Sequence, residues 1–496
     1  MVTIGYDVGS SSLKAALYDV NTGKAIAHSA YPKEEMTILS PKPGWAEQDP
    51  ETWWNALKNT TSELLAVSKI KPENIKAIGI SYQMHGLVLA DKDRNVLRPS
   101  IIWCDSRAVE IGNQAFKNIG EEKCLEHLLN SPGNFTASKL KWVMQNEPDI
   151  FKKIYKIMLP GDYIAMKLTD RFTTTSEGLS EGIFWEFDKD KPSKFLLDYY
   201  GFNESLLPEI TPIFGTQCVL SEKAAKETGL VTGIPVTYRA GDQPNNAFSL
   251  NVLEPGEIAA TAGTSGVVYG ISEEIKYDPL NRINTFLHVN HTEEKRRLGI
   301  LLCINGTGIS NSWIRRMLFD GSASYEDMNR YAEETEIGSK GLSFIPFGNG
   351  AERMLQNTEP GAGFAGLNYN HHSRGHLVRA VLEGVAFSFV YGINIMKGLA
   401  VNPTVIRAGM ANMFLSKTFR ETIASLSGAQ IQLYNTDGAI GAARAAAYGA
   451  GFYSSFNEAF NGLERLSTVE PDNKNKELYT IAYNKWLKEL NYHLNK

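Results

Sequence analysis

The sequence predicts an α/β protein made of two large domains. Its 496 residues exceed the size at which a single hydrophobic core stops growing. In the first half, apolar strand-like runs alternate with helical patterns, which is typical of a sheet covered by helices. Each half also contains a short loop rich in glycine and hydroxyl groups, set between two apolar runs. We therefore expect an N-terminal domain over residues 1–247 and a C-terminal domain over residues 248–496.

The elements of the first half follow from their apolar patterns. Short apolar runs that end in polar residues predict strands, and such strand ends tend to line the ligand crevice of an α/β sheet. Residues 51–67 repeat apolar side chains at helical spacing and predict a helix. The strands are expected over residues 2–6, 13–20, 75–81 and 234–240, and residues 101–107 are expected to run from a strand into polar residues.

The second half contains three helical patterns of different kinds. Residues 377–391 are almost wholly apolar and predict a long buried helix. Residues 441–447 are nearly all Gly and Ala, so this helix can pack closely against its neighbours. Residues 474–494 place aromatic and aliphatic side chains on one side, which predicts an amphipathic helix. These side chains are Tyr479, Tyr483, Trp486 and Leu490.

Composition excludes several classes of partner. A net charge of −5 offers no electrostatic reason to propose nucleic acid or an anionic membrane as a partner. The four cysteines are too few and too scattered for a disulfide framework or a zinc site. The N-terminus enters a strand pattern directly, and no apolar run approaches the ~18 residues of a membrane span. We therefore expect a cytoplasmic protein, and a homodimer is left open.

The two glycine loops predict a phosphate site. The first glycine loop, residues 7–14, reads Asp-Val-Gly-Ser-Ser-Ser-Leu-Lys, and the second glycine loop, residues 262–266, reads Ala-Gly-Thr-Ser-Gly. Glycine lets the backbone approach a bulky anion, while hydroxyls and amides donate to its oxygens. Either loop alone is typical of an ordinary hairpin. Together, in two halves of one chain, they favour a polyphosphate held in a cleft between two domains.

Two aspartates suit phosphoryl transfer from ATP, which needs a phosphate cradle, Mg²⁺ and a base beside the acceptor hydroxyl. Asp7 is a hard carboxylate beside the first glycine loop and suits Mg²⁺ held partly through water. Lys14 either adds positive charge there or is simply a solvated side chain. Asp242 follows a predicted strand, where it can accept a proton from an alcohol; the alternative is a cap or turn residue before Pro244.

These segments resemble the FGGY carbohydrate kinases, whose fold is the duplicated ribonuclease-H-like ATPase fold of actin and hexokinase. The glycine loops are similar to the family's two phosphate motifs, and Gly241-Asp242-Gln243 is similar to the motif that bears its catalytic base. Residues 362–383 fit one family signature, and residues 134–142 fit the other more loosely. The resemblance implies ATP and Mg²⁺ as cofactors and a sugar as substrate, with both bound in the cleft between the two domains.

Within the family, Gln83-Met84-His85-Gly86 is similar to the segment with which members acting on D-xylulose contact the sugar. Glycerol kinases carry Arg-Glu there instead. The resemblance therefore implies transfer of phosphate from ATP to D-xylulose, giving D-xylulose 5-phosphate, with Asp242 as base and Asp7 as metal ligand. The sugar-binding residues that it implies are Met84, His85, Trp103, Arg107, Asp242 and Gln243. Those for ATP are Ser10, Ser11, Ser12, Lys14, Gly263, Thr264, Gly308, Gly409 and Asn412.

The sequence departs from the family in two places. Ala408 stands in a run near the expected adenine site where the family often has glycine, and residues 243–246 are more polar than the usual small-residue run. The alternatives are therefore another kinase of this family acting on gluconate, ribulose or glycerol, an actin-like ATPase switch, and an idle sugar-binding protein. Asp7 and Asp242, both present, argue against the idle protein.

Overall fold

The computed structural model describes residues 1–495, which form two compact units. The first unit is made of Met1–Asn251, Phe286–Leu298 and Thr436–Leu463, and the second unit contains the remaining residues. The end of the first segment lies close to the division that we expected after residue 247. Residues 436–463 differ from the expectation, because they pack with the first unit although they lie late in the sequence.

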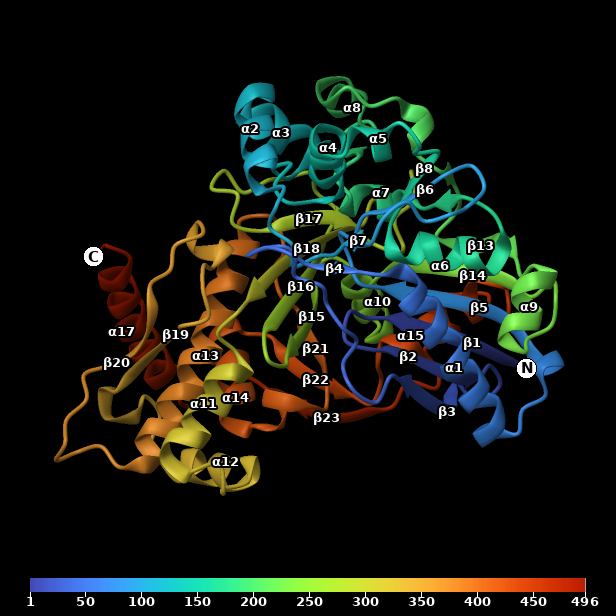
Figure 1. Ribbon diagram of the computed structural model, residues 1–496. Helices are drawn as coiled ribbons and strands as arrows, with labels where there is room; N and C mark the ends of the chain where they lie inside the picture. The colour runs from blue at the N-terminus through green and yellow to red at the C-terminus, as the bar shows by residue number, and fades with distance from the viewer. Residues whose placement is uncertain (496) are drawn as a thin grey trace. The chain divides into compact units, whose positions relative to one another are not determined.

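A six-stranded sheet forms the centre of the first unit (Figure 1). Its central strands β14, β5 and β1 run parallel, and β2 pairs antiparallel with β1. The strands predicted near residues 2–6, 13–20, 75–81 and 234–240 are confirmed. In spatial order the strands are β13 (Phe214–Val219), β14 (Pro235–Gly241), β5 (Ile75–Tyr82), β1 (Val2–Val8), β2 (Leu13–Asp19) and β3 (Lys24–Tyr31).

The strand expected at the start of residues 101–107 is much shorter than predicted. Only β7 (Ser100–Ile101) is extended, and it pairs with the equally short β4 (Glu47–Gln48). The carboxylate of Asp105 accepts hydrogen bonds from the amides of Ala46 and Arg107, at 2.6 and 2.8 Å. These bonds turn the chain directly after the strand, which the apolar pattern did not reveal.

Helices cover both faces of the first sheet. Because successive strand side chains point to opposite faces, Tyr6 packs in one core with α1 (Pro50–Ser68), while Gly5 faces α15 (Gly438–Gly449) on the other side. The first core also takes side chains from α6 and α9. The further helices of this unit are α2 (Val109–Ile119), α3 (Glu121–Leu128), α4 (Thr136–Asn146), α5 (Pro148–Phe151), α6 (Pro160–Thr169), α7 (Ser176–Glu181), α8 (Lys194–Tyr200), α9 (Glu222–Thr228), α10 (Asp242–Ser249) and α16 (Phe456–Ala459).

Two strand glycines explain why α15 belongs to the first unit. A Cβ on Gly5 or on Gly79 would lie closer than 3.0 Å to the main chain of α15. The close packing expected for this small-residue helix is therefore confirmed, with β1 and β5 as its neighbours. The hydroxyl of Thr3 adds a hydrogen bond of 2.7 Å to the carbonyl of Ala443. Sequence order alone did not indicate this return of the chain to the first sheet.

Replacing Gly79 by alanine should destabilise the first unit by about 3 kcal/mol, the upper end for an overpacked core. The new methyl group would meet the carbonyl of Ala442, and backbone on both sides leaves no flexible side chain to move away. Thermal unfolding measures the effect. Gly363→Ala is the control, because a Cβ there meets nothing within 4 Å. Equal melting temperatures for the two variants would contradict this packing.

A seven-stranded sheet forms the centre of the second unit. Its core is formed with α13, α14 and α17, and the amphipathic face predicted for α17 is buried as expected. In spatial order the strands are β17 (Asn284–Leu287), β18 (Leu298–Ile304), β16 (Gly266–Ser272), β15 (Glu257–Ala262), β21 (Val405–Gly409), β22 (Gln430–Tyr434) and β23 (Arg465–Val469). The helices are α11 (Gly308–Phe319), α12 (Tyr325–Glu333), α13 (Arg374–Lys397), α14 (Lys417–Ser427) and α17 (Lys476–Leu494).

Helix α13 corrects one sequence expectation. We expected no apolar run near the length of a membrane span, yet this helix has 24 residues and is long and apolar enough for one by composition. Inside the protein, 89% of its most apolar 18-residue window is buried. A helix that is apolar on all sides and surrounded by other elements is typical of a protein core, and α13 packs against α11, α12 and α14.

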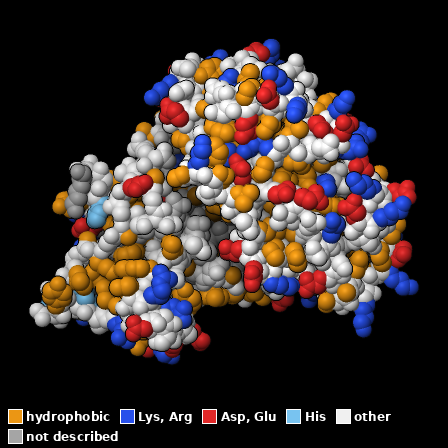
Figure 2. All heavy atoms as spheres, viewed as in Figure 1, with side chains coloured by type: hydrophobic (Ala, Val, Ile, Leu, Met, Phe, Trp, Pro, Cys, Tyr) orange, Lys and Arg blue, Asp and Glu red, His pale blue; other side chains and the backbone are white. Residues whose placement is uncertain are grey.

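Charged side chains of both signs are scattered over the visible face of the first unit. Figure 2 shows Lys and Arg interspersed with Asp and Glu there. The first unit also has exposed ion pairs one helical turn apart, such as Lys194 with Asp198 and Lys226 with Glu222. Exposed pairs of this kind contribute little to stability. The distinctive chemistry of the first unit lies in its buried groups.

Candidate active site

Three parallel strands bring predicted site residues to one edge of the first sheet. Asp7 is the penultimate residue of β1, Met84 and His85 follow the end of β5, and Asp242 follows the end of β14. Because β1, β5 and β14 are neighbours and parallel, their carboxyl ends meet at the same edge. This is where open α/β sheets bind ligands. The parallel topology thus unites four residues that lie far apart in the sequence.

The first glycine loop is a tight turn between β1 and β2. The amide of Gly9 donates to the carbonyl of Ser12 at 3.1 Å, and a Cβ on Gly9 would come closer than 3.0 Å to that carbonyl oxygen. The side chain of Gln48 donates to the carbonyl of Ser10 at 2.7 Å. Ser11 is exposed at the tip of the loop, and Lys14 is exposed on β2, opposite Asp7 in register.

Asp7 lies in a crowded and largely buried position. The hydroxyl of Ser81 donates to its Oδ1 at 2.8 Å, and a Cβ on Gly438 would lie 2.5 Å from its Oδ2. Burial raises the pKa of Asp7, and the negative charge of Asp437 adds to this, while Ser81 and the positive charge of Lys14 oppose it. Glycine at the start of α15 therefore leaves the space that the Asp7 carboxylate occupies.

Asp242 is the first residue of α10 and follows Gly241 directly. Burial, followed by the negative charge of Asp7, raises the pKa of Asp242 to about 7, despite hydrogen bonds with Gln243. A carboxyl with a pKa near neutrality is suited to act as a general base. Residues 242–246, which the sequence suggested to be polar residues after a strand, begin helix α10. Pro244 lies in the first turn of this helix, where the missing N–H of proline costs no hydrogen bond.

The pair Asp7 and Asp242 fits a divalent cation. Each carboxyl is held back from ionising by burial and by a neighbouring carboxylate, and a cation beside them would relieve both effects. Within residues 1–495 no cluster of three or more His, Cys, Asp or Glu side chains could enclose a metal ion. Mg²⁺ suits such a site, because it is commonly held by one or two carboxylates, with water and phosphate as its other ligands.

His85 adopts an unusual backbone conformation at this edge. Its φ of +62° lies in the left-handed region, which residues other than glycine rarely adopt. Its ring packs on those of Phe135 and Phe286, with centroid distances of 4.8 and 5.3 Å. The buried Lys139 donates to the carbonyl of His85 at 2.8 Å, and burial lowers the pKa of this lysine to about 8. Met84 is buried beside His85.

Sequence reasoning missed two buried carboxyl groups beside this edge. Glu177 and Glu181 on α7 are both wholly buried, and burial raises the pKa of each, with Glu177 adding to the effect on Glu181. Among the charged groups around them, Arg239 is paired with Asp162 at 3.1 Å. The only available signal was two glutamates four residues apart in a run of small residues, Thr-Thr-Ser-Glu-Gly-Leu-Ser-Glu-Gly.

Trp103 and Arg107, predicted together, occupy different environments. Trp103 is 53% exposed, and its indole NH lies 3.4 Å from the hydroxyl oxygen of Ser10 in the first glycine loop. The side chain of Arg107 is buried, forms ion pairs of 2.7 Å with both Asp105 and Glu47, and stacks on the ring of Trp45. The guanidinium of Arg107 is thus held by the protein itself, whereas the ring of Trp103 is open to a ligand.

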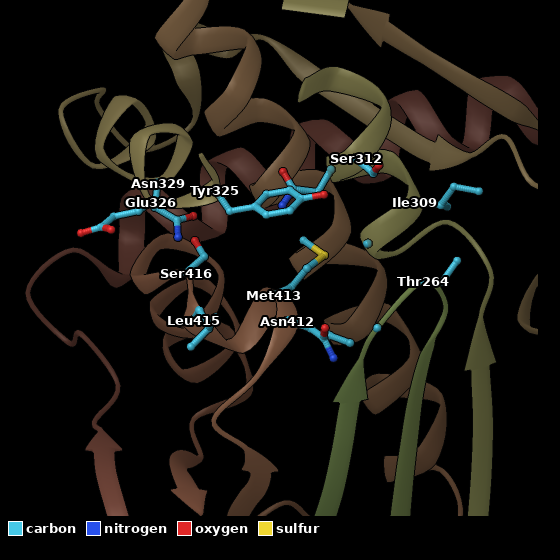
Figure 3. Close-up of a pocket in the computed structure, with 14 residues that line it drawn as sticks. Thr264, Ile309, Ser312, Tyr325, Glu326, Asn329, Asn412, Met413, Leu415 and Ser416 are labelled. Carbon is cyan, nitrogen blue, oxygen red and sulfur yellow. The ribbon is translucent and has the colours of Figure 1, made fainter. Parts of the chain in front are cut away.

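In the second unit, the second glycine loop lies against the start of α11. The amide of Gly308 donates to the carbonyl of Gly263 at 2.9 Å, and that of Ile309 donates to the carbonyl of Thr264 at 3.1 Å. Three predicted residues, Gly263, Thr264 and Gly308, therefore lie side by side. They line one end of a cavity of about 650 Å³, and Figure 3 shows Thr264 at the turn between two strands there.

The rest of this cavity is lined by residues from α11, α12 and the segment 412–416. Figure 3 shows Asn412 and Met413 on one side, with the ring of Tyr325 opposite. Gly409 ends β21 and does not line the cavity, and Ala408 is buried in the core. Ala408 therefore does not narrow the cavity. Sequence reasoning missed three lining residues of α12, which are Tyr325, Glu326 and Asn329.

Comparison with known proteins covers nearly the whole chain. Residues 2–249 match the N-terminal domain of the FGGY family of carbohydrate kinases, and residues 258–450 match its C-terminal domain. The xylulose kinase of Escherichia coli (strain K12) is 28% identical over 476 residues, which is 95% of this chain and 94% of that protein. The xylulose kinase of Bacillus subtilis (strain 168) is 29% identical over 490 residues, 97% and 95% of the two chains. The crystal structure of xylulose kinase from Rhodospirillum rubrum has a TM-score of 0.90 at 25% identity and covers 100% of both chains.

Proposed function

The chain belongs to the FGGY family of carbohydrate kinases, which have the two-domain α/β fold of actin- and hexokinase-type ATPases, and on that premise we propose that its sugar is D-xylulose. The phosphoryl donor of this carbohydrate kinase is ATP. The proposed reaction yields ADP and D-xylulose 5-phosphate and takes place in the cytoplasm. Its support is the similarity to two xylulose kinases over at least 94% of every chain compared.

The meeting of β1, β5 and β14 at one sheet edge is the structural observation that carries the proposal. At this edge, Met84 and His85 follow β5, and Asp242 and Gln243 follow β14, so that apolar, donor and acceptor groups that suit a polyhydroxy ketose come from neighbouring strand ends. The indole of Trp103 offers a further exposed surface for the sugar. Asp242 takes the proton of the attacking sugar hydroxyl as its oxygen bonds to the γ-phosphorus, and ADP leaves. Arg107 supports the segment that carries Trp103, through its ion pairs with Asp105 and Glu47.

Each unit offers groups suited to the phosphates of a nucleotide at its own glycine loop. In the second unit, Gly263, Thr264 and Gly308 offer main-chain and hydroxyl groups to phosphate oxygens, and Asn412, which lines the same cavity, lies toward the nucleoside. In the first unit, Ser10, Ser11, Ser12 and Lys14 offer the same kinds of donor. Asp7 would hold Mg²⁺, which supplies positive charge to the phosphates during transfer.

A panel of acceptors tests the proposed substrate. We expect kcat/KM to be at least about tenfold higher for D-xylulose than for D-ribulose, gluconate or glycerol, because buried polar groups reject a substrate that leaves them unpaired. A coupled assay of ADP release with ATP and Mg²⁺ measures this. A higher kcat/KM for another acceptor would make that compound the substrate. ATP hydrolysis indifferent to every sugar would instead indicate an ATPase switch.

A further inference from the structure

Two carboxyl groups on one helical turn reach from α7 toward the sheet edge that carries Asp242 and His85. Glu177 and Glu181 are four residues apart, so they project from the same face of the helix. Both are 0% exposed. The hydroxyl of Thr175 caps the helix by accepting from the amide of Gly178 at 3.1 Å. The two carboxyls therefore have defined positions in the interior of the first unit.

Glu177 binds the chain directly before Asp242. Its Oε2 accepts the amide of Gly241 at 3.2 Å, and Gly241 is the last residue of β14. A Cβ on Gly241 would lie 2.7 Å from the side chain of Met84, so the segment after β5 packs directly against this point. A shift of Glu177 would therefore move the residue that precedes Asp242.

Glu181 binds the second segment of the site. Its Oε2 accepts the amide of His85 at 3.1 Å and lies 3.4 Å from Nδ1 of the same residue. The main-chain carbonyl of Glu181 lies 3.0 Å from that Nδ1. Together with Lys139 on the carbonyl of His85, these contacts hold a residue whose left-handed backbone is intrinsically unfavourable. Without Glu181, the His85 amide would lose this buried acceptor.

We infer that Glu177 and Glu181 are positioning residues that hold the main chain at Gly241 and His85, and thereby fix the catalytic base and the sugar-binding histidine relative to each other. They act through hydrogen bonds to main-chain amides, without touching substrate. The inference rests on the proposed roles of Asp242 and His85. It adds that one helical turn holds the ends of two neighbouring strands, at Gly241 after β14 and at His85 after β5.

Alanine and glutamine variants test this role. We expect Glu177→Ala to lower kcat by about 100-fold, because a misplaced catalytic group loses that much rate. Glu181→Ala should mainly raise the KM for the sugar, by about tenfold, through His85. Glu177→Gln and Glu181→Gln keep an oxygen acceptor and should retain most of the activity. The control is Glu186→Ala, which removes a buried carboxyl on β10 (Trp185–Glu186) that pairs with Lys189 and should leave both constants unchanged.

Amide hydrogen exchange gives a readout that needs no substrate. In both alanine variants, the amide that loses its acceptor should exchange at least about tenfold faster, at Gly241 for Glu177 and at His85 for Glu181. Failure of D-xylulose as substrate would not affect this result, and kinetics would then use the best acceptor of the panel. If the alanine variants do not fold, Glu177→Asp and Glu181→Asp withdraw each carboxyl by one methylene and carry the same expectations. Unchanged exchange and kinetics, or equal losses in the glutamine variants or in Glu186→Ala, would overturn the inference.

Discussion

Replacing Asp242 by asparagine should lower kcat by about 100-fold to 10,000-fold, while the KM for the sugar changes little. Asparagine matches aspartate in size and can occupy the first position of α10, but its amide cannot take a proton from the sugar hydroxyl. Steady-state kinetics of ADP release measures the loss. Asp49→Asn is the control, because Asp49 caps α1 through the amide of Glu51, and asparagine caps a helix equally well.

The pH dependence of kcat/KM in the wild type should also report the ionisation of Asp242. Burial and the charge of Asp7 raise the pKa of Asp242 to about 7 in the free protein. Because the base acts only when ionised, kcat/KM should be low at pH values below this pKa and should rise as the pH increases through it. Asp242→Asn should lose this rise. A variant that retains near-normal kcat, or keeps the same profile, would show that Asp242 is not the base.

Replacing Gly308 by alanine should weaken nucleotide binding by about 100-fold, as expected for an overpacked backbone contact that costs about 3 kcal/mol. A Cβ at this position would come closer than 3.0 Å to the carbonyl oxygen of Gly263, and this main chain has no rotamer by which to move away. The second glycine loop would therefore shift from the start of α11, and the hydrogen bond between Gly308 and Gly263 would break. Calorimetric titration with ADP and Mg²⁺ measures the affinity.

Gly363→Ala is again the control, because it makes the same chemical change where a Cβ meets nothing within 4 Å. A third variant, Gly263→Ala, distinguishes a distorted second glycine loop from a loop of normal shape that the nucleotide cannot approach closely. Its Cβ would have only ordinary contacts of 3.7 Å, with Asn412 and Ser265, so the fold should tolerate it. Normal ADP affinity in Gly308→Ala would show that this loop does not bind the nucleotide.

Local sequence patterns predicted most of the elements that position the site. Strand patterns that end in polar residues located β1, β5 and β14, and parallel neighbours necessarily place their carboxyl ends together. Asp7, His85 and Asp242 could therefore be grouped before their contacts were known. The glycine loops were also local features, since the need for a close backbone approach is visible in the residue type itself.

Features that depend on distant contacts could not be predicted. Glu177 and Glu181 look like ordinary polar residues in the sequence, and only the tertiary fold buries them beside Gly241 and His85. The ion pairs that Arg107 makes with Asp105 and Glu47 also form only in the folded chain. The return of α15 to the first sheet depends on Gly5 and Gly79, more than 350 residues earlier, and no local pattern connects them.

The fate of the γ-phosphoryl group tests the central claim most directly. Phosphorus NMR of the wild-type reaction with ATP, Mg²⁺ and D-xylulose should show ADP and a sugar phosphate monoester forming in equal amounts, with the monoester on the C5 oxygen. Inorganic phosphate in place of the monoester, with D-xylulose recovered unchanged, would contradict the account.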